Sequence, residues 1–362
     1  MEIKIYQAEC GDAASIRYFG SDNKYHNIFI DSGYERTFRL TLFEEIKEIK
    51  KRGEVIDLWI LSHIHDDHVG GVMKYLQIIK SGELDDIVNN WYYNVPRYNS
   101  VNFINNKTSI SASINQGDAI YEYLKLNNKL LETDITSELE SINLFGLKLT
   151  ILSPSIQKLN RLRKKYPLNK TNYLERSELT SISEAKTLKN NDYTVKTSEF
   201  ELENFSEDKS IENGSSIAVM TEFYKNKIIW LADSHPSDVI KTLKRMGFSK
   251  NNQIECDWVK VAHHGSDGNN SNELYNLIKC NNYIISSNGE NKYNLPEKKS
   301  LVRILTNENR PKNSIYNFYF TYDNETLKSI FKVDGVNVYN NLKFTTNFLS
   351  DSKYLKILNL NN

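Results

Sequence analysis

The chain has 362 residues, which is enough for one large domain or two ordinary ones. Its 46 basic and 46 acidic side chains give a formal charge of zero, which excludes a global basic field for attracting nucleic acid but not a local patch. A hydrophobic fraction of 39% excludes a disordered chain.

The expected compartment follows from the N-terminus, the hydropathy and the cysteines. The segment Met1–Tyr6 is amphipathic and has no apolar signal core. No run reaches the roughly 18 apolar residues that a membrane helix needs. Three widely spaced cysteines without a C-x-x-C pair suit a reducing environment. We therefore expect a cytoplasmic protein with no membrane association.

The first part of the chain predicts strands and one helix before a long apolar run. Polar and apolar residues alternate over 2–7, which predicts a first strand, and 14–19 and 27–30 predict two more. Helical periodicity covers 38–50. The apolar run 58–61 predicts a buried strand.

Three histidines and an aspartate follow that buried strand within six residues. His63 and His65 are two apart, so on an extended segment they point the same way and can bind one metal. Asp67 and His68 lie past the bend, just before Gly70-Gly71, and can face a second metal. Imidazole and carboxylate are ligands for zinc, manganese or iron. The alternative is a polar surface turn, but such turns favour Gly, Asn, Asp and Ser.

The rest of the chain alternates predicted strands and helices. Strands are predicted at 87–93, 144–153, 257–262 and 283–287, a hairpin at 216–223 with 227–231, helices at 111–126, 273–279 and 295–304, and an antiparallel hairpin at 314–344. Residues 155–212 are rich in Lys, Glu and Ser and are interpreted as an insertion. Within it, Arg161 and Lys164 could contact phosphates or lie on a solvated helix face.

The sequence H-x-H-x-D-H after a hydrophobic strand resembles the metallo-β-lactamase fold superfamily. The resemblance implies an α/β fold, a four-layer αββα sandwich over residues 1–345 with the insertion at 155–212 and a C-terminal tail at 346–362. Several motifs look like the ComEC-type branch, the nuclease-like domain of DNA-uptake proteins: Gly11-Asp12-Ala13, Asp31-Ser32-Gly33, Leu152-Ser153-Pro154 and Lys260–Ser266. One departure is Leu295-Pro296, which stands where that branch commonly has His-Pro.

The resemblance also implies roles for individual residues. Asp31 is expected to orient a metal-bound histidine, and Asp233 to bridge two metals. His263 is expected to complete the second metal's shell with Asp67, His68 and Asp233, with His264 as a neighbour or proton donor.

The start of the predicted hairpin departs from the superfamily pattern. Many members place a metal-binding histidine there, whereas this chain has Asn213 and Ser216, which are expected beside the metals. His235 could be a substitute ligand, a substrate-binding imidazole or a bystander. Lys260 could position a phosphate group.

The function implied by the resemblance is metal-dependent hydrolysis. Two divalent cations, Zn²⁺ or Mn²⁺, would lower the pKa of a bound water from 15.7 to about 7, so that a metal-bound hydroxide attacks a phosphodiester of nucleic acid or a nucleotide. Asp67, His264 and His235 are the expected catalytic groups. Free-standing relatives occur in bacterial antiphage gene clusters, which implies a defence role with protein partners. The alternatives are hydrolysis of a lactone, amide or thioester, and a weakly catalytic sensor or scaffold subunit.

Overall fold

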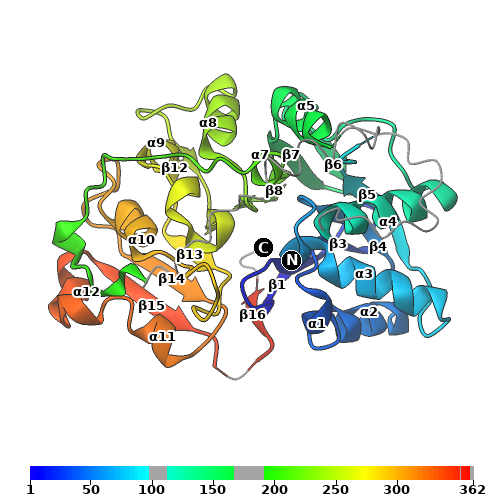
Figure 1. Cartoon of the computed structure of the whole chain (residues 1–362), viewed down its shortest axis with the longest axis horizontal. Coiled ribbons are helices and arrows are strands. Elements are labelled where there is room, and N and C mark those ends of the chain that lie inside the picture. The colour runs from blue at the N-terminus through cyan, green and yellow to red at the C-terminus, as the bar shows by residue number, and fades with distance from the viewer. Residues whose placement is uncertain (98–111, 167–190, 351, 359–362) are drawn as a thin grey trace.

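Two β-sheets packed face to face form the centre of the protein, and helices cover the outer side of each (Figure 1). The computed structural model describes residues 1–97, 112–166, 191–350 and 352–358. The predicted α/β fold with four αββα layers is therefore confirmed. The expected start of a helix at residue 111 and part of the insertion at 155–212 lie outside the described residues.

The first sheet has six strands, in the order β16 (Tyr354–Leu358), β1 (Glu2–Tyr6), β2 (Ala13–Phe19), β3 (Tyr25–Asp31), β4 (Ile56–Leu61) and β5 (Val88–Tyr93). Strands β3, β4 and β5 are parallel, and the other neighbours are antiparallel. Its outer face packs against α1 (Glu35–Phe38), α2 (Leu42–Lys51), α3 (Asp66–Lys80) and α4 (Ala112–Leu126).

The second sheet has eight strands, in the order β15 (Phe344–Phe348), β14 (Tyr316–Phe320), β13 (Asn282–Ile285), β11 (Trp258–Lys260), β9 (Asn226–Trp230), β8 (Ala218–Phe223), β7 (Leu147–Ser153) and β6 (Ile142–Leu144). The five strands from β9 to β15 are parallel. The helices of this half are α8 (Pro236–Arg245), α9 (Asn272–Asn276), α10 (Lys298–Leu305), α11 (Glu325–Lys328) and α12 (Asn337–Asn341).

Shorter elements complete the described chain. Helix α5 (Ile156–Lys165) and the 3-10 turns η1 (Asp192–Thr194) and η2 (Thr197–Glu199) belong to the expected insertion, and helix α7 (Ile211–Gly214) crosses its expected end at residue 212. A small parallel pair is formed by β10 (Ile254–Glu255) and β12 (Ile278–Lys279). Further 3-10 turns are η3 (Ala262–Gly265), η4 (Asp267–Asn269) and η5 (Lys332–Asp334).

Strand β4 is buried on both faces, and this burial fixes the position of the motif that follows it. Leu58 and Ile60 pack between the two sheets, whereas Trp59 and Leu61 pack under the helices of the first sheet. A central parallel strand that is covered on both sides reads as a continuous apolar run, as this one does. The carboxyl ends of the parallel strands meet at one edge of each sheet, where ligand sites of layered α/β folds are found.

Two expectations about the C-terminal part need correction. Residues 314–344 do not form an antiparallel hairpin, because β14 and β15 are parallel and the chain between them forms α11 and α12. Alternation reports which face of a strand is buried, and parallel neighbours need a crossover connection that alternation does not reveal. The segment expected as a tail is also structured: β16 pairs antiparallel with β1, and the boundary expected at residue 345 falls inside β15.

Glu54 links the first sheet to the loop before β4, and it predicts a pH dependence of stability. It accepts hydrogen bonds from Arg17 Nε (2.9 Å) and Asn27 Nδ2 (3.1 Å), and Arg52 Nε lies 3.3 Å away. Burial would raise the pKa of Glu54, but these donors lower it from 4.5 to about 2. The stabilisation is therefore present above pH 4.5 and is lost as the pH falls toward 2. Glu54→Gln should lower the free energy of unfolding by about 1 kcal/mol at pH 7.

Urea unfolding at pH 7 and at pH 2.5 checks this expectation for Glu54→Gln. The difference between the variant and the wild type should shrink at the lower pH. A difference that is the same at both pH values would contradict the assigned role of the Glu54 carboxylate.

Candidate metal centre

The turn between β4 and α3 carries the H-x-H-x-D-H motif. His63 and His65 lie on the extended segment after β4, and α3 begins at Asp66 with His65 as its N-cap residue. The ring centroids of His63 and His65 are 4.7 Å apart, and those of His63 and His68 are 4.3 Å apart. The turn thus gathers three imidazoles into one cluster.

Asp31, at the end of β3, fixes the orientation of His68. This fully buried carboxylate accepts hydrogen bonds from His68 Nδ1 at 2.8 Å, from the Ser62 backbone N–H at 2.7 Å and from Ser62 Oγ at 2.8 Å. Burial raises the pKa of Asp31, and the neighbouring His68 imidazole counteracts that rise. With Nδ1 of His68 held in this way, its Nε2 faces the centre of the site, as a carboxylate behind a metal-binding histidine would arrange it.

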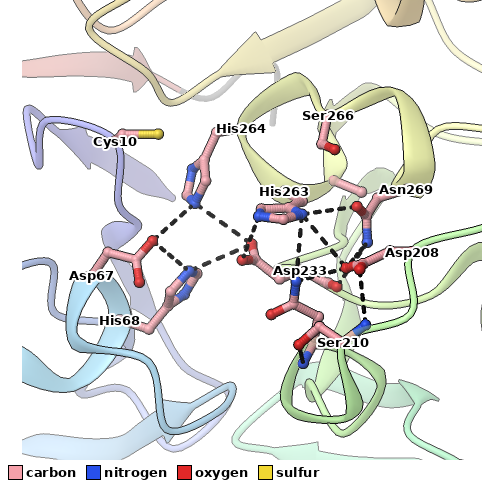
Figure 2. Close-up of polar contacts among 12 residues, drawn as sticks. Cys10, Asp67, His68, Asp208, Ser210, Asp233, His263, His264, Ser266 and Asn269 are labelled. Carbon is pink, nitrogen blue, oxygen red and sulfur yellow. Dashed lines mark hydrogen bonds and ion pairs between the residues drawn. The ribbon is translucent and has the colours of Figure 1, made fainter. Parts of the chain in front are cut away.

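Asp233 follows β9 and lies among four imidazoles. Figure 2 shows three of them around its carboxylate, those of His68, His263 and His264. Its Oδ1 is 3.4 Å from His68 Nε2 and 3.6 Å from His264 Nε2. Its Oδ2 is 3.5 Å from His263 Nε2 and 3.8 Å from His63 Nε2. Burial would raise the pKa of Asp233, but His263, His68 and His264 lower it well below the ordinary value. An ionised carboxylate therefore lies where two groups of ligands meet.

The histidine doublet leaves β11 in a strained conformation that turns both rings toward Asp233. His263 has φ 44° and ψ 55°, and His264 has φ 54° and ψ 19°, in the left-handed region that non-glycine residues seldom adopt. Such strain is stored at functional sites when the surrounding structure holds it. His264 Nδ1 is 2.9 Å from the Ser286 carbonyl oxygen, and His263 Nδ1 is 2.8 Å from Asn269 Oδ1.

The two members of the doublet take the opposite places to those expected. His264, which is 1% exposed, groups with Asp67, His68 and Asp233, and its Nε2 lies 3.4 Å from Asp67 Oδ2. His263 instead faces the other oxygen of Asp233, and 24% of its side chain is exposed. The sequence could not show which of the two histidines joins the ligand group. Two consecutive left-handed residues do not continue the side-chain alternation of the preceding strand.

The buried polar atoms of the site fit two divalent cations. In the part of the chain that the structure describes, three groups have ligand atoms within 4.8 Å of one another, and the two that share Asp233 are the ligand groups of the site: Asp67, His68, Asp233 and His264 form one, and His63, His65 and Asp233 form the other. The third joins Asp12 and Asp31 to His68, whose Nδ1 is already hydrogen-bonded to Asp31. Within the described residues, several of these buried atoms have no hydrogen-bond partner: His63 Nε2, His68 Nε2, His264 Nε2, Asp233 Oδ1 and Asp233 Oδ2. Each unpaired buried polar atom costs about 1–3 kcal/mol, and two cations shared by Asp233 would satisfy them all.

Lys260 does not take the place expected for a phosphate-binding group. Its side chain is buried, and its ammonium forms an ion pair with Asp12. Asp12 in turn donates its backbone N–H to the Asp67 carbonyl at 3.1 Å and lies 3.5 Å from His264 Nδ1. Lys260 therefore compensates a buried carboxylate that supports the site, and its charge does not reach solvent.

Asn213 and Ser216 lie beside the site, and neither belongs to a ligand group. Asn213 Nδ2 donates to Asp208 Oδ2 at 2.6 Å and is 3.5 Å from His263 Nδ1. Ser216 is fully buried, and its Oγ has no hydrogen-bond partner among the described residues.

His235 lies apart from both ligand groups, because its Nε2 is 3.9 Å from Asp208 Oδ2 and its ring packs against Gly214. The structure thus does not bring His235 to Asp233 as a substitute ligand. Burial and the nearby Lys158 lower the pKa of His235, while Asp208 and Glu207 oppose that fall.

Two residues that connect the site were missed at the sequence level. Asp208 links His263, Asn213 and Asn269 through one carboxylate oxygen, Oδ2 (Figure 2). Asn269 holds His263 and donates to the Asp233 carbonyl at 3.1 Å. Asp208 lies in a Lys- and Glu-rich stretch without periodicity, and Asn269 follows the doublet in a polar turn. Neither position carries a signal that separates it from ordinary turn residues.

Among the comparisons with known proteins, one family model matches part of this chain. The family described as metallo-beta-lactamase superfamily matches residues 23–81, which include β3, β4 and the H-x-H-x-D-H turn. A comparison with curated proteins found no match. No helix within the described residues is long and apolar enough to cross a membrane.

Two solved structures are similar to this chain at low identity. One is a mutant of the CmlA beta-hydroxylase, with 11% identity, a TM-score of 0.38 and coverage of 98% of this chain and 53% of that chain. The other is the metallo-beta-lactamase IND-7, with 17% identity, a TM-score of 0.19 and coverage of 39% of this chain and 47% of that chain. This chain thus spans about half the length of each. Residues 23–81 thus resemble the metallo-beta-lactamase superfamily, and the αββα layers of the chain are consistent with that fold.

Proposed function

We propose that this protein is a metal-dependent phosphodiesterase that acts on nucleic acid or a nucleotide with two divalent cations, Zn²⁺ or Mn²⁺. The observation that carries the proposal is the buried Asp233 carboxylate, whose unpaired Oδ1 faces His68 and whose unpaired Oδ2 faces His63. A buried carboxylate in such surroundings is stabilised when cations occupy both sides. When bound, such cations supply an acidified water and charge stabilisation for a phosphoryl group.

The residues of the chain would divide this work between holding the cations and handling substrate. Asp67, His68, Asp233 and His264 would hold one cation, and His63, His65 and Asp233 the other. Asp31 would keep His68 in the required tautomer, because its carboxylate accepts the Nδ1 proton. Phosphate is favoured over a lactone or thioester as substrate by cationic side chains in a cavity beside the site.

His263 is the residue that we assign to proton transfer. It is the more exposed member of the doublet, its Nδ1 is held by Asn269, and it is not in either ligand group. An imidazole at the mouth of the site can protonate a leaving oxygen, and such transfer contributes about 10²–10⁴-fold to rate. His264 and His235, expected for this role from the sequence, are less suitable: His264 Nε2 lies among the ligand atoms, and His235 faces Asp208.

His263→Gln should therefore lower kcat by about 10²-fold while the metal content stays unchanged. Steady-state kinetics and metal analysis on the same preparation check this. His26→Gln is the matched control, because His26 pairs with Asp22 and Asp57, both outside the ligand groups. Loss of a metal equivalent in His263→Gln would show that His263 is a ligand and would contradict the proton-transfer role.

A substrate panel with metal removal tests the proposed activity. The full chain should cleave at least one of single-stranded DNA, double-stranded DNA, RNA or cyclic dinucleotides. A chelator should abolish turnover, added Zn²⁺ or Mn²⁺ should restore it, and the melting temperature should fall on chelation because cations stabilise only the folded state. Turnover of lactones or thioesters, with none of any phosphodiester, would overturn the proposal.

A further inference from the structure

A cavity of ≈ 370 Å³ lies beside the metal centre, between α5, the segment before α7 and the start of α8. Its lining combines three cations, two carboxylates and one imidazole: Lys158, Arg161, Lys209, Glu207, Asp208 and His235. Asp208 forms the wall shared with the metal centre, since its Oδ2 is 3.8 Å from His263 Nδ1 and 3.9 Å from His235 Nε2. A ligand in this cavity would therefore lie next to the proposed reaction centre.

The two carboxylates of the cavity are already engaged by donors of the protein. Glu207 accepts hydrogen bonds from the Ser237 backbone N–H at 2.9 Å and from Ser237 Oγ at 3.1 Å. Asp208 accepts from Asn213 Nδ2 at 2.6 Å and from the backbone N–H of Ser210 at 2.9 Å. These bonds hold both carboxylates in the cavity wall, and the lining keeps three positive side chains against these two negative ones.

The cations are less engaged. Lys158 donates to Ser237 Oγ at 2.8 Å and lies 3.7 Å from both Glu207 and Asp238. Arg161 and Lys209 are exposed side chains, and neither has a hydrogen bond or ion pair to another described residue. Two positive groups at the cavity are therefore free to bind an anion.

His235 provides a second, independent sign of a ligand. It is 7% exposed, it lines the cavity, and its Nε2 has no hydrogen-bond partner among the described residues. Leaving a buried ring nitrogen without a partner costs free energy. A bound phosphate would remove this cost by accepting a hydrogen bond from the nitrogen or by donating one to it. Burial also lowers the pKa of Lys158, although the nearby carboxylates of Asp238 and Glu207 oppose that fall.

We propose that this cavity binds a second phosphate of a nucleic acid substrate, next to the phosphodiester at the metal centre, through Arg161, Lys209 and His235. The inference rests on the proposed function, because it requires a nucleic acid substrate, which has a second phosphate next to the phosphodiester at the metal centre. It also separates two residues that the sequence grouped together: Arg161 lines the cavity, whereas Lys164, on the same helix, does not.

The test compares a substrate that has a neighbouring phosphate with one that has none. In the metal-loaded full chain, the double variant Arg161→Ala/Lys209→Ala should raise KM for a short oligonucleotide about tenfold and leave kcat nearly unchanged, because each phosphate contact adds to binding. Turnover of bis(p-nitrophenyl) phosphate, which has one phosphate, should not change. Lys241→Ala is the matched control, an exposed cation on α8 that does not line the cavity.

Binding without turnover keeps this inference distinguishable from the proposed activity. Fluorescence anisotropy with a labelled oligothymidylate, in the presence of a chelator, should show weaker binding for the double variant and unchanged binding for Lys241→Ala. The plot of log binding constant against log salt concentration should also become less steep, by the amount expected for the loss of about one to two phosphate contacts. Equal binding by the double variant and the wild type, or an equal loss in Lys241→Ala, would overturn the inference. If the wild type binds the oligothymidylate and the double variant binds it more weakly, but no phosphodiester is cleaved, the proposed activity is refuted and the phosphate-binding cavity is not.

Discussion

Asp233→Asn is expected to reduce the metal content from about two equivalents to about one or fewer and to lower turnover by about 10³-fold or more. Both oxygens of Asp233 are buried and unpaired, and Oδ1 faces His68 whereas Oδ2 faces His63. An amide keeps the shape of the side chain but loses its charge and one acceptor. If two cations bind, the Asp233 carboxylate would stabilise both. Losing about 4 kcal/mol of that charge stabilisation corresponds to a 10³-fold loss of turnover, at 1.36 kcal/mol per factor of ten.

Metal analysis and kinetics on the same preparation check this expectation. Asp57→Asn serves as the control, because Asp57 also lies 3.1 Å from a histidine, His26, but outside the ligand groups. The control should keep both cations and full turnover. Full metal content in Asp233→Asn, with turnover within threefold of the wild type, would contradict the bridging role.

Asp31→Ala is expected to lower the free energy of unfolding by about 3–5 kcal/mol and to weaken metal binding by about 10–100-fold. The substitution leaves His68 Nδ1 and the Ser62 backbone N–H without their acceptor in a fully buried place. It also frees the ring of His68, whose Nε2 faces Asp233 at 3.4 Å. The same carboxylate thus supports the fold and the metal centre.

Urea unfolding and competition with a metal-binding dye measure the two effects separately. Asp31→Asn is a useful second variant, since it preserves volume and should destabilise less while still losing metal affinity. If Asp31→Asn binds metal as tightly as the wild type, the Asp31 carboxylate does not orient a ligand, and only its structural role remains.

The sequence was informative where chemistry and periodicity coincide. The apolar run that became β4 is buried on both faces, and a run of this kind followed by H-x-H-x-D-H places the imidazoles at the end of a strand. The roles expected of Asp31 and Asp233 came from the resemblance to the superfamily. The structure places Asp31 at the end of β3 and Asp233 just beyond β9, at the edge where the parallel strands end.

The remaining features depend on contacts that local patterns do not encode. The choice between His263 and His264 is made by two consecutive left-handed residues and by Asn269 and Ser286, which hold the rings. Lys260 is charged and follows a strand pattern, but its burial against Asp12 depends on a residue far away in the chain. The parallel pairing of β14 with β15 likewise depends on crossover helices and not on alternation.

The most direct test of the account is the metal content of the purified full chain, measured by inductively coupled plasma mass spectrometry with protein concentration determined on the same sample. The unpaired buried atoms around Asp233 predict about two tightly held divalent cations per chain, removed by a chelator together with turnover. Less than about half an equivalent of metal, with turnover that a chelator does not change, would contradict a two-cation centre at Asp233.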